Sequence, residues 1–194
     1  MDLFDAILSR RTFPPAKMGL PGPDESQLQR ILEAGDAAPD HGMLRPWRFL
    51  VVRGEGRGEL GELFAACVRR NAPGATADEI DKQRSAPLRA PVIVVVAAHL
   101  QPRHPKIPTV EQVAAVSAAA QNMLLAAHAL GLVAKWATGK QAYDDAVKAG
   151  LGLAPDDQII GFLYLGSPAV PHEVPPRRKL APRRRRARGL ARSQ

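Results

Sequence analysis

Apolar residues recur along the chain at two kinds of spacing. Spacings of three and four residues predict amphipathic helices, and short continuous runs rich in Val, Ile and Leu predict strands that are covered on both faces. Helices are predicted at residues 2–11, from Asp24 to a point before Pro39, and at 57–70, 77–86, 110–130 and about 142–150. Strands are predicted at 47–53, 91–98, 136–138 and 158–165, with a loop at 18–23. This order of elements predicts an α+β fold or a three-layer sandwich.

Local signals add detail to three of these helices. Asp24 is a suitable N-cap, because Gln27 three residues later completes a capping box. Cys67 lies on the apolar stripe of 57–70. Nothing near it in the sequence favours a thiolate, so we interpret it as a packing residue. The many alanines of 110–130 indicate close helix packing, either in the core of a subunit or at a dimer interface.

The positive charge of the chain is concentrated at its C-terminal end. The formal net charge is +8, but nine of the 27 Lys and Arg lie between Arg177 and Gln194, without any acid. Residues 1–176 then hold 18 basic and 19 acidic side chains, which is close to neutral. We therefore expect one folded domain at 1–176 and a basic tail at 177–194 that is too charged to pack and is largely disordered. Such a tail predicts only weak, salt-sensitive and non-specific binding to nucleic acid.

Bulk properties exclude several other classes of protein. A single cysteine cannot form an internal disulfide, and the N-terminus lacks a basic segment followed by an apolar one. The longest apolar run, 91–98, is far shorter than a bilayer span. We therefore expect a cytoplasmic protein without membrane association. Five scattered histidines offer no cluster of metal ligands.

Short motifs that would reveal a common catalytic site are absent from the sequence. There is no GxGxxG after a first strand, no Walker loop, no HExxH, no CxxC and no GxSxG elbow. These absences argue against a Rossmann dinucleotide fold, a zinc protease and a serine hydrolase. If the protein is an enzyme, we expect a bound organic cofactor to carry its chemistry.

Four segments contain groups that suit a phosphorylated, aromatic cofactor. The first, at 9–12, reads Ser-Arg-Arg-Thr and offers forked donors for phosphate, although an arginine pair is also common at a solvated helix end. The second, at 38–49, is a polar loop with two prolines and a histidine, or simply a connector with a packed tryptophan. The third, at 136–139, ends a strand at a glycine, where the backbone can approach a flat ring. The fourth, at 175–179, holds cations that could close over a phosphate.

The fragments SRRT, APDHGMLRPWRF, WATG and GFLYLGSP, in that order, resemble the nitroreductase family, and in particular its compact members. The similarity covers essentially residues 1–170. The resemblance implies an α+β fold, a three-layer α/β/α sandwich around a central mixed, mainly antiparallel sheet, in an intertwined homodimer. It also implies two FMN sites at the dimer interface, each built from both subunits.

The resemblance assigns roles to residues by their position. One subunit would bind FMN with Arg10, Arg11, Thr12, Trp136, Ala137, Thr138 and Gly139. The other subunit would contribute Pro39, Asp40 and His41, with Ala37 near the same site, and Arg177 or Arg178 would meet the phosphate. Nicotinamide contacts would fall on Ala126, Ala127, His128, Ala129, Leu130 and Gly131. Compact members usually read WRSG where this chain reads WATG, so the chain lacks their cation at position 137.

The implied activity is that of an FMN-dependent oxidoreductase. Hydride would pass from NADH or NADPH to the flavin and then to a nitroaromatic, a quinone or a related small-molecule electron acceptor, by a ping-pong mechanism. The flavin would carry the chemistry, so no catalytic side chain and no metal is expected. Two alternatives are a flavin-binding protein without redox turnover and a binding protein whose arginine-rich tail contacts nucleic acid or another anionic surface.

Overall fold

The computed structural model describes residues 1–169, so the predicted basic tail, with Arg177 and Arg178, lies outside the described residues. The α-helices of this part are α1 (Leu3–Ser9), α2 (Glu25–Asp36), α3 (Gly56–Asn71), α4 (Ala77–Arg84), α5 (Thr109–Ala129) and α6 (Asp145–Gly150). Its strands are β1 (Met18–Gly19), β2 (Trp47–Arg53), β3 (Val92–Ala98), β4 (Val133–Ala137) and β5 (Gln158–Pro168). Short 3-10 helices occur at η1 (Pro15–Lys17), η2 (His41–Met43), η3 (Ala86–Arg89) and η4 (Lys140–Tyr143).

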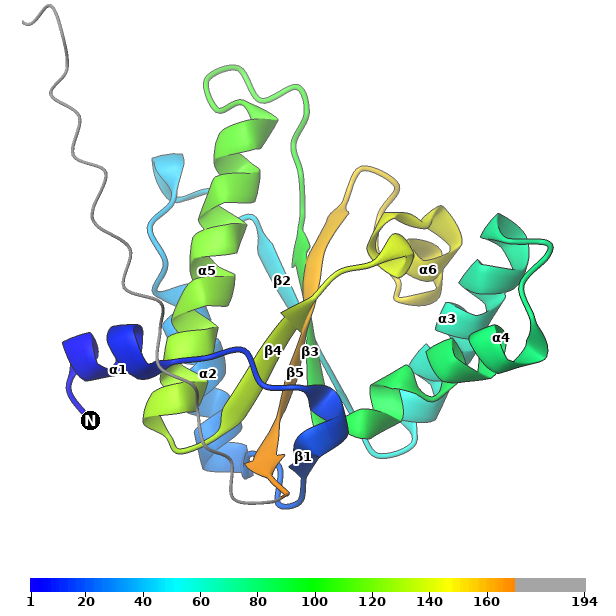
Figure 1. Ribbon diagram of the computed structural model, residues 1–194. Coiled ribbons are helices and arrows are strands. Elements are labelled where there is room, and N and C mark those ends of the chain that lie inside the picture. The colour runs from blue at the N-terminus through cyan, green and yellow to red at the C-terminus, as the bar shows by residue number, and fades with distance from the viewer. Residues whose placement is uncertain (170–194) are drawn as a thin grey trace, which may run out of the picture.

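One sheet contains these five strands, and β5 pairs with three of the others (Figure 1). The order is β1-β5-β3-β2, with β4 also paired to β5, and every pair of these strands is antiparallel. A parallel contact is added by the isolated bridge between Thr12 and Ala134. The prediction of a mainly antiparallel sheet is therefore confirmed.

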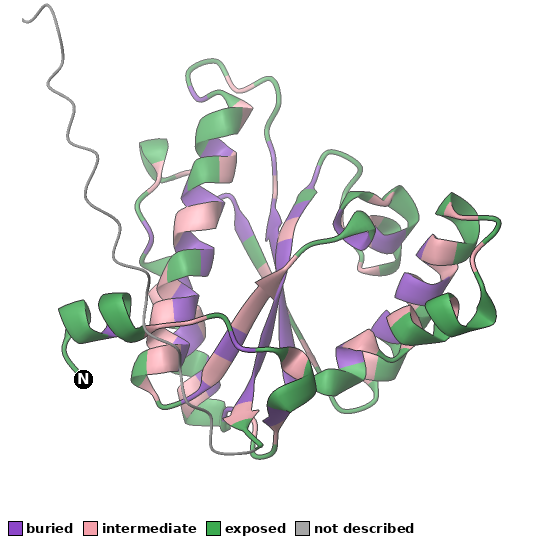
Figure 2. Ribbon diagram, in the orientation of Figure 1, coloured by how far each residue is buried: buried purple, intermediate pink, exposed green. Residues whose placement is uncertain are grey.

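Alternation along the central strand β3 produces two separate cores. All seven residues of β3 are buried. Val94 and Val96 belong to a core on the side of α2 and α5, whereas Ile93 and Val95 belong to one on the side of α3 and α6. Figure 2 shows this burial along the sheet and the inner faces of the helices. The predicted three-layer α/β/α sandwich is confirmed.

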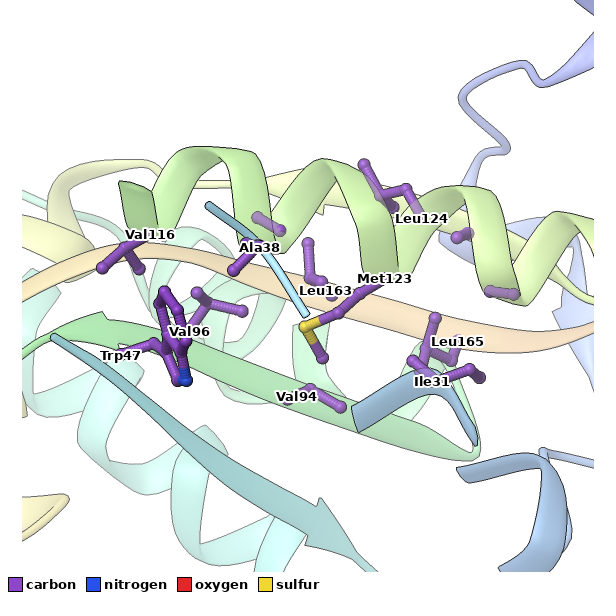
Figure 3. Packing of buried hydrophobic residues seen from close by; sticks show 14 of the residues in the cluster. Ile31, Ala38, Trp47, Val94, Val96, Val116, Met123, Leu124, Leu163 and Leu165 are labelled. Carbon is purple, nitrogen blue, oxygen red and sulfur yellow. The ribbon is translucent and has the colours of Figure 1, made fainter. Parts of the chain in front are cut away.

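The core on the α5 side includes a long side chain from that helix. Met123 of α5 is fully buried and points toward the strands, where Val94 and Leu163 lie (Figure 3). Ile31 of α2 contributes to the same cluster. The alanines of α5 let the helix lie close to the sheet, since Ala119, Ala120 and Ala127 are fully buried. The predicted close packing of this helix is thus found inside the subunit core.

Elements with a strong local signal lie where the sequence predicts them. The strand 47–53 forms over those residues as β2. The capping box of α2 is present: the Gln27 backbone N–H donates to the Asp24 carboxylate at 2.7 Å, and the Asp24 N–H donates to Gln27 Oε1 at 3.0 Å. Cys67 is buried, as predicted for a packing residue.

The helices predicted at 2–11 and 77–86 are each shorter in the structure, as α1 and α4. Four other predicted boundaries differ more. Residues 18–19, predicted within a loop, form the short strand β1, because they pair with Ser167 and Pro168 at the end of β5. That pairing also extends β5 beyond residue 165. Strand β4 begins at Val133, three residues before the predicted segment. The predicted helix at about 142–150 is divided into η4 and α6, and Asp144 caps α6.

The first helix forms but does not bury its large apolar residues within this chain. In α1 only Ala6 is buried. Leu3, Phe4 and Leu8 are 65%, 74% and 63% exposed, and Figure 2 shows most of α1 as exposed. The expected amphipathic helix therefore presents an uncovered apolar surface.

Candidate functional site

A cavity of about 520 Å³ lies on the α3 side of the sheet, where β4 ends. Its polar wall follows the chain from β4 into η4 and includes Thr138, Gly139 and Gln141. Its apolar wall comes from α3 and β5, through Phe64 and Tyr164. The complete lining is Phe64, Cys67, Val68, Asn71, Ala72, Gln83, Ala86, Lys135, Ala137, Thr138, Gly139, Lys140, Gln141 and Tyr164.

Glycine is required at position 139 of this lining. Gly139 has φ +82°, in the left-handed region that side chains rarely adopt. A Cβ there would lie 2.7 Å from Gln141 Oε1. The Gln141 amide in turn donates to Gln83 Oε1 at 2.9 Å, which joins η4 to α4. The space that a side chain at 139 would take is therefore occupied by the Gln141 amide, while Thr138 and Gly139 both line the cavity.

Of the predicted segment 136–139, only Trp136 does not line the cavity. Side chains alternate along a strand, so Trp136 and Ala137 point to opposite faces of the sheet. The Trp136 indole N–H donates to the Ile160 carbonyl at 3.0 Å, and its ring packs against the α5-side core. Gly161 makes room, since a Cβ there would lie 2.1 Å from Trp136 Nε1. Any contact of Trp136 with a ligand in the cavity must come from its backbone.

The predicted segment 10–12 runs beside the same strand. Thr12 pairs with Ala134 in the parallel bridge, and the Phe13 N–H donates to the Ala134 carbonyl at 3.0 Å. Thr12 therefore lies beside the start of β4, more than a hundred residues away in the sequence. Arg10, Arg11 and Thr12 are not among the lining residues of the cavity. Arg11 also caps α1, because its Nη1 donates to the Leu8 carbonyl at 2.7 Å.

The segment 126–131 covers the end of α5 and the turn into β4. The turn depends on Gly131, which has φ +81°. The Ala127 side chain is fully buried, so it is not available to a ligand. The pKa of His128 is lowered by burial and by the nearby charges of Arg10 and Arg11, which keeps its imidazole neutral.

The segment 37–41 lies at the other end of α5 (Figure 1). Ala37 is the C-cap of α2, and His41 Nδ1 lies 2.6 Å from Glu111 Oε2 in the first turn of α5. The helix rises about 25 Å from Glu111 to His128. The structure therefore places segment 10–12 beside the start of β4 and the His128 end of α5, and it holds 39–41 at the opposite end of that helix within one chain.

A carboxylate beside the cavity controls the local electrostatics. Asp144 accepts from Arg70 at 2.5 Å, from Asn71 at 2.7 Å and from the Val147 N–H at 2.9 Å. Burial would raise its pKa, but these donors lower it to about 2. Burial and the charge of Asp144 raise the pKa of Cys67, so the thiol stays protonated. The interpretation of Cys67 as a packing residue, not a nucleophile, is consistent with this environment.

Sequence reasoning did not identify several residues of the cavity. Lys135 lines it beside Ala137, and the two-residue period of a strand could have placed both on one face. No local pattern could have identified Gln83, which reaches the cavity from α4 through the packing of α4 on α3.

Two other site types are absent from the described part of the chain. Residues 1–169 contain no group of three or more His, Cys, Asp or Glu side chains that could hold a metal ion. None of their helices is both long enough and apolar enough to cross a bilayer.

Comparison with known proteins gives a consistent result. A model described as "Nitroreductase family" matches residues 19–167. The protein named "Putative NAD(P)H nitroreductase YdjA" of Escherichia coli (strain K12) is 39% identical over 172 residues, which is 88% of this chain and 90% of that protein. A nitroreductase-like family protein from Bacillus cereus superposes with a TM-score of 0.76 at 26% identity, covering 92% of each chain. A protein described as "a putative nitroreductase in complex with fmn", from Desulfovibrio desulfuricans, gives a TM-score of 0.67 at 27% identity over 91% of each chain.

Proposed function

Because this chain belongs to the nitroreductase family, we propose that it is an FMN-dependent oxidoreductase. It takes reducing equivalents from NADH or NADPH and delivers them to a nitroaromatic, a quinone or a related small acceptor. The observation that carries the proposal is the cavity at the end of β4, whose lining includes Ala137, Thr138 and Gly139. The segment 10–12 lies beside the same strand.

The residues of the cavity fit a flavin. Its size is within the range of pockets that hold cofactors. Phe64, Val68 and Tyr164 offer apolar surface to a flat ring, and the amides of Gln83 and Gln141 suit the polar edge of such a ring. Thr138 and Gly139 line the cavity, and glycine adds no side chain of its own between the backbone and a ring.

Bound FMN would supply the hydride chemistry. The side chains would bind and orient the cofactor and neutralise its negative charge. Arg10 is assigned to the phosphate, through a charge-assisted hydrogen bond. Lys135 and Lys140 bring positive charge to the cavity, and no Asp or Glu is among its described lining residues. This charge favours ligands that become more negative on reduction. No side chain has to act as a general acid or base.

The order of the two half-reactions is part of the proposal. We expect ping-pong kinetics, in which the oxidised nicotinamide leaves before the acceptor enters. The segment 126–131 is assigned to the nicotinamide nucleotide, through its exposed residues and its backbone. Initial rates at several acceptor concentrations should then give parallel double-reciprocal lines, and intersecting lines would contradict this order.

The site is proposed to be completed by a second copy of the chain. Arg10 and His41 belong to opposite ends of α5, so a site containing both needs His41 from the partner subunit. The exposed apolar side chains of α1, Leu3, Phe4 and Leu8, provide surface that a second copy would cover. Sedimentation analysis should show a dimer. The free buried Cys67 is consistent with the reducing cytoplasm that we propose for the protein.

A spectrum of the purified protein tests the proposal directly. We expect a yellow protein that absorbs at about 450 nm, a general property of oxidised flavin. Anaerobic NADH or NADPH should bleach this band, and an acceptor should restore it. A colourless protein that FMN cannot reconstitute would contradict the proposal, and colour without bleaching would favour a flavin-binding protein without turnover.

A further inference from the structure

The loop between α2 and β2 has a strained backbone. Met43 and Arg45 have φ of 52° and 45°, in the left-handed region that is uncommon for residues other than glycine. Two contacts hold the loop in this conformation. The Arg45 N–H donates to the Asp40 carboxylate at 2.7 Å, and Gly42 approaches Ile107 so closely that a Cβ would lie 2.8 Å from its Cδ1. Strain that is held in this way is typical of functional segments.

The loop also has surface that suits a partner. Met43 is 83% exposed, which is unusual for an apolar side chain in a strained loop. Pro39, Asp40 and His41 line a shallow hollow of about 370 Å³ against Ala114 and Ala118 of α5. A second copy of the chain and its bound cofactor would cover this surface in the dimer proposed above.

The hydrogen bond between His41 and Glu111 determines which atom of the imidazole is offered to a ligand. His41 Nδ1 lies 2.6 Å from Glu111 Oε2. An ionised carboxylate can only accept, so Nδ1 carries the hydrogen. In the neutral imidazole, Nε2 is then an acceptor with a free lone pair.

The charge of the hollow defines the ligand group that fits it. Asp40 and Glu111, both acidic, line it together with His41. Two carboxylates and a lone pair disfavour a phosphate, whereas they favour an N–H donor. The pyrimidine edge of a flavin ring has such a ring N–H.

We propose that Glu111 is a positioning residue for His41. It holds the imidazole so that Nε2 can accept a hydrogen bond from a ring N–H of the flavin that the partner subunit binds. This rests on the proposed function, and in particular on the site shared by two subunits. Glu111 touches no ligand itself; it acts through the imidazole. The strained loop keeps the imidazole in place before the cofactor binds.

Equilibrium FMN binding to the dimer, measured by quenching of flavin fluorescence, tests the proposal. We expect Glu111→Ala to raise the Kd about tenfold, as for the loss of one hydrogen bond. Because Glu111 acts through His41, the double variant Glu111→Ala/His41→Ala should bind no more weakly than His41→Ala alone. Additive losses in the double variant, or wild-type affinity in Glu111→Ala, would overturn the proposal.

Glu25→Ala is the matched control. Glu25 is also an acid in the first turn of a helix and also makes a 2.7 Å ion pair, with Arg53. Its removal should leave FMN affinity unchanged. An equal loss in Glu25→Ala would mean that a general effect of helix charge, and not His41, explains the result.

A second measurement needs no cofactor. In the protein free of FMN, ¹⁵N spectra of the His41 imidazole should show the hydrogen on Nδ1, and Glu111→Ala should move it to Nε2. An unchanged tautomer would overturn the proposal. If the wild-type protein fails to bind FMN, the proposed function is wrong, whereas normal FMN binding with an ineffective Glu111→Ala refutes only the role of Glu111.

Discussion

Ser9 and His128 connect the first helix to the end of the longest one: His128 Nε2 lies 2.7 Å from Ser9 Oγ. The Ser9 hydroxyl donates to the Asp5 carbonyl at 2.6 Å. It must therefore accept from His128, whose Nε2 carries the hydrogen. This agrees with the lowered pKa of His128. A neutral imidazole with its hydrogen on Nε2 can donate to the Ser9 hydroxyl and adds no positive charge beside Arg10 and Arg11. The contact holds Arg10 and Arg11 beside the start of the segment that leads into β4.

Ser9→Ala should lower the free energy of unfolding by about 1 kcal/mol, because a half-buried imidazole N–H loses its acceptor. Urea denaturation followed by circular dichroism measures this. Ser117→Ala is the control, since its hydroxyl donates only to the Val113 carbonyl within α5. Equal effects of the two substitutions would show that the link between α1 and α5 adds nothing to stability.

Arg10→Ala should weaken FMN binding by at least about tenfold, since a charge-assisted contact to the phosphate is lost. Flavin fluorescence titration gives the Kd. Arg30→Ala, on the exposed face of α2, should bind FMN like the wild type. Unchanged affinity in Arg10→Ala would contradict its assignment to the phosphate.

Mixed dimers test whether each site uses two subunits. A dimer formed from one Arg10→Ala chain and one His41→Ala chain has one site with both substitutions and one site with neither. Co-expression of the two variants should therefore restore FMN binding and NAD(P)H oxidation above the level of either variant alone. If both residues served a site within one chain, mixing would restore nothing.

Asp144→Asn should cost about 2 kcal/mol of stability at neutral pH, because the pKa of Asp144 is lowered from 3.8 to about 2 in the folded state. A carboxylate with a depressed pKa stabilises the fold above its unfolded pKa. The difference from wild type should hence shrink as the pH falls from about 4 to about 2. Asp145→Asn is the control, because the Asp145 side chain is 92% exposed and should have little effect. A cost that stays constant down to pH 2 would refute the linkage.

Gly139→Ala should destabilise the protein by about 1–2 kcal/mol, since alanine at a φ of +82° is strained. It should also weaken FMN binding, because the new Cβ displaces Gln141 from its contact with Gln83. Thermal unfolding and flavin titration measure the two effects. Gly74→Ala, with no atom within 4 Å of the added Cβ, should change neither. Normal FMN binding by Gly139→Ala would show that the backbone at residue 139 does not belong to the flavin site.

Local signals in the sequence determined most of the elements. The capping box of Asp24 and Gln27 fixed where α2 begins, and the run of valines identified β3 as a strand buried on both faces. These features depend on residues within a few positions of each other, so periodicity and capping rules can identify them. Strand β1 was not predicted, because two residues are too few to show a periodic pattern. They form a strand only because they pair with the end of β5, which is distant in the sequence.

The candidate site was predictable only in part, for a related physical reason. The segments 10–12, 39–41 and 136–139 could be selected from the sequence, by their residue types and by resemblance. Strand pairing and helix packing decided the rest. They place Thr12 beside Ala134 and turn the Trp136 indole away from the cavity. They also bring Lys135 and Gln83 into the cavity lining.

By itself, then, the sequence determined most of the elements, the near-neutral body with its basic tail, and a set of candidate residues for a phosphorylated aromatic cofactor. Only the tertiary structure decided how those residues are distributed. It places Ser9 and His41 at opposite ends of α5, each tied there by a histidine hydrogen bond, to His128 and to Glu111. The physical reason is that a helix is rigid, so segments fixed to its two ends cannot meet within one chain.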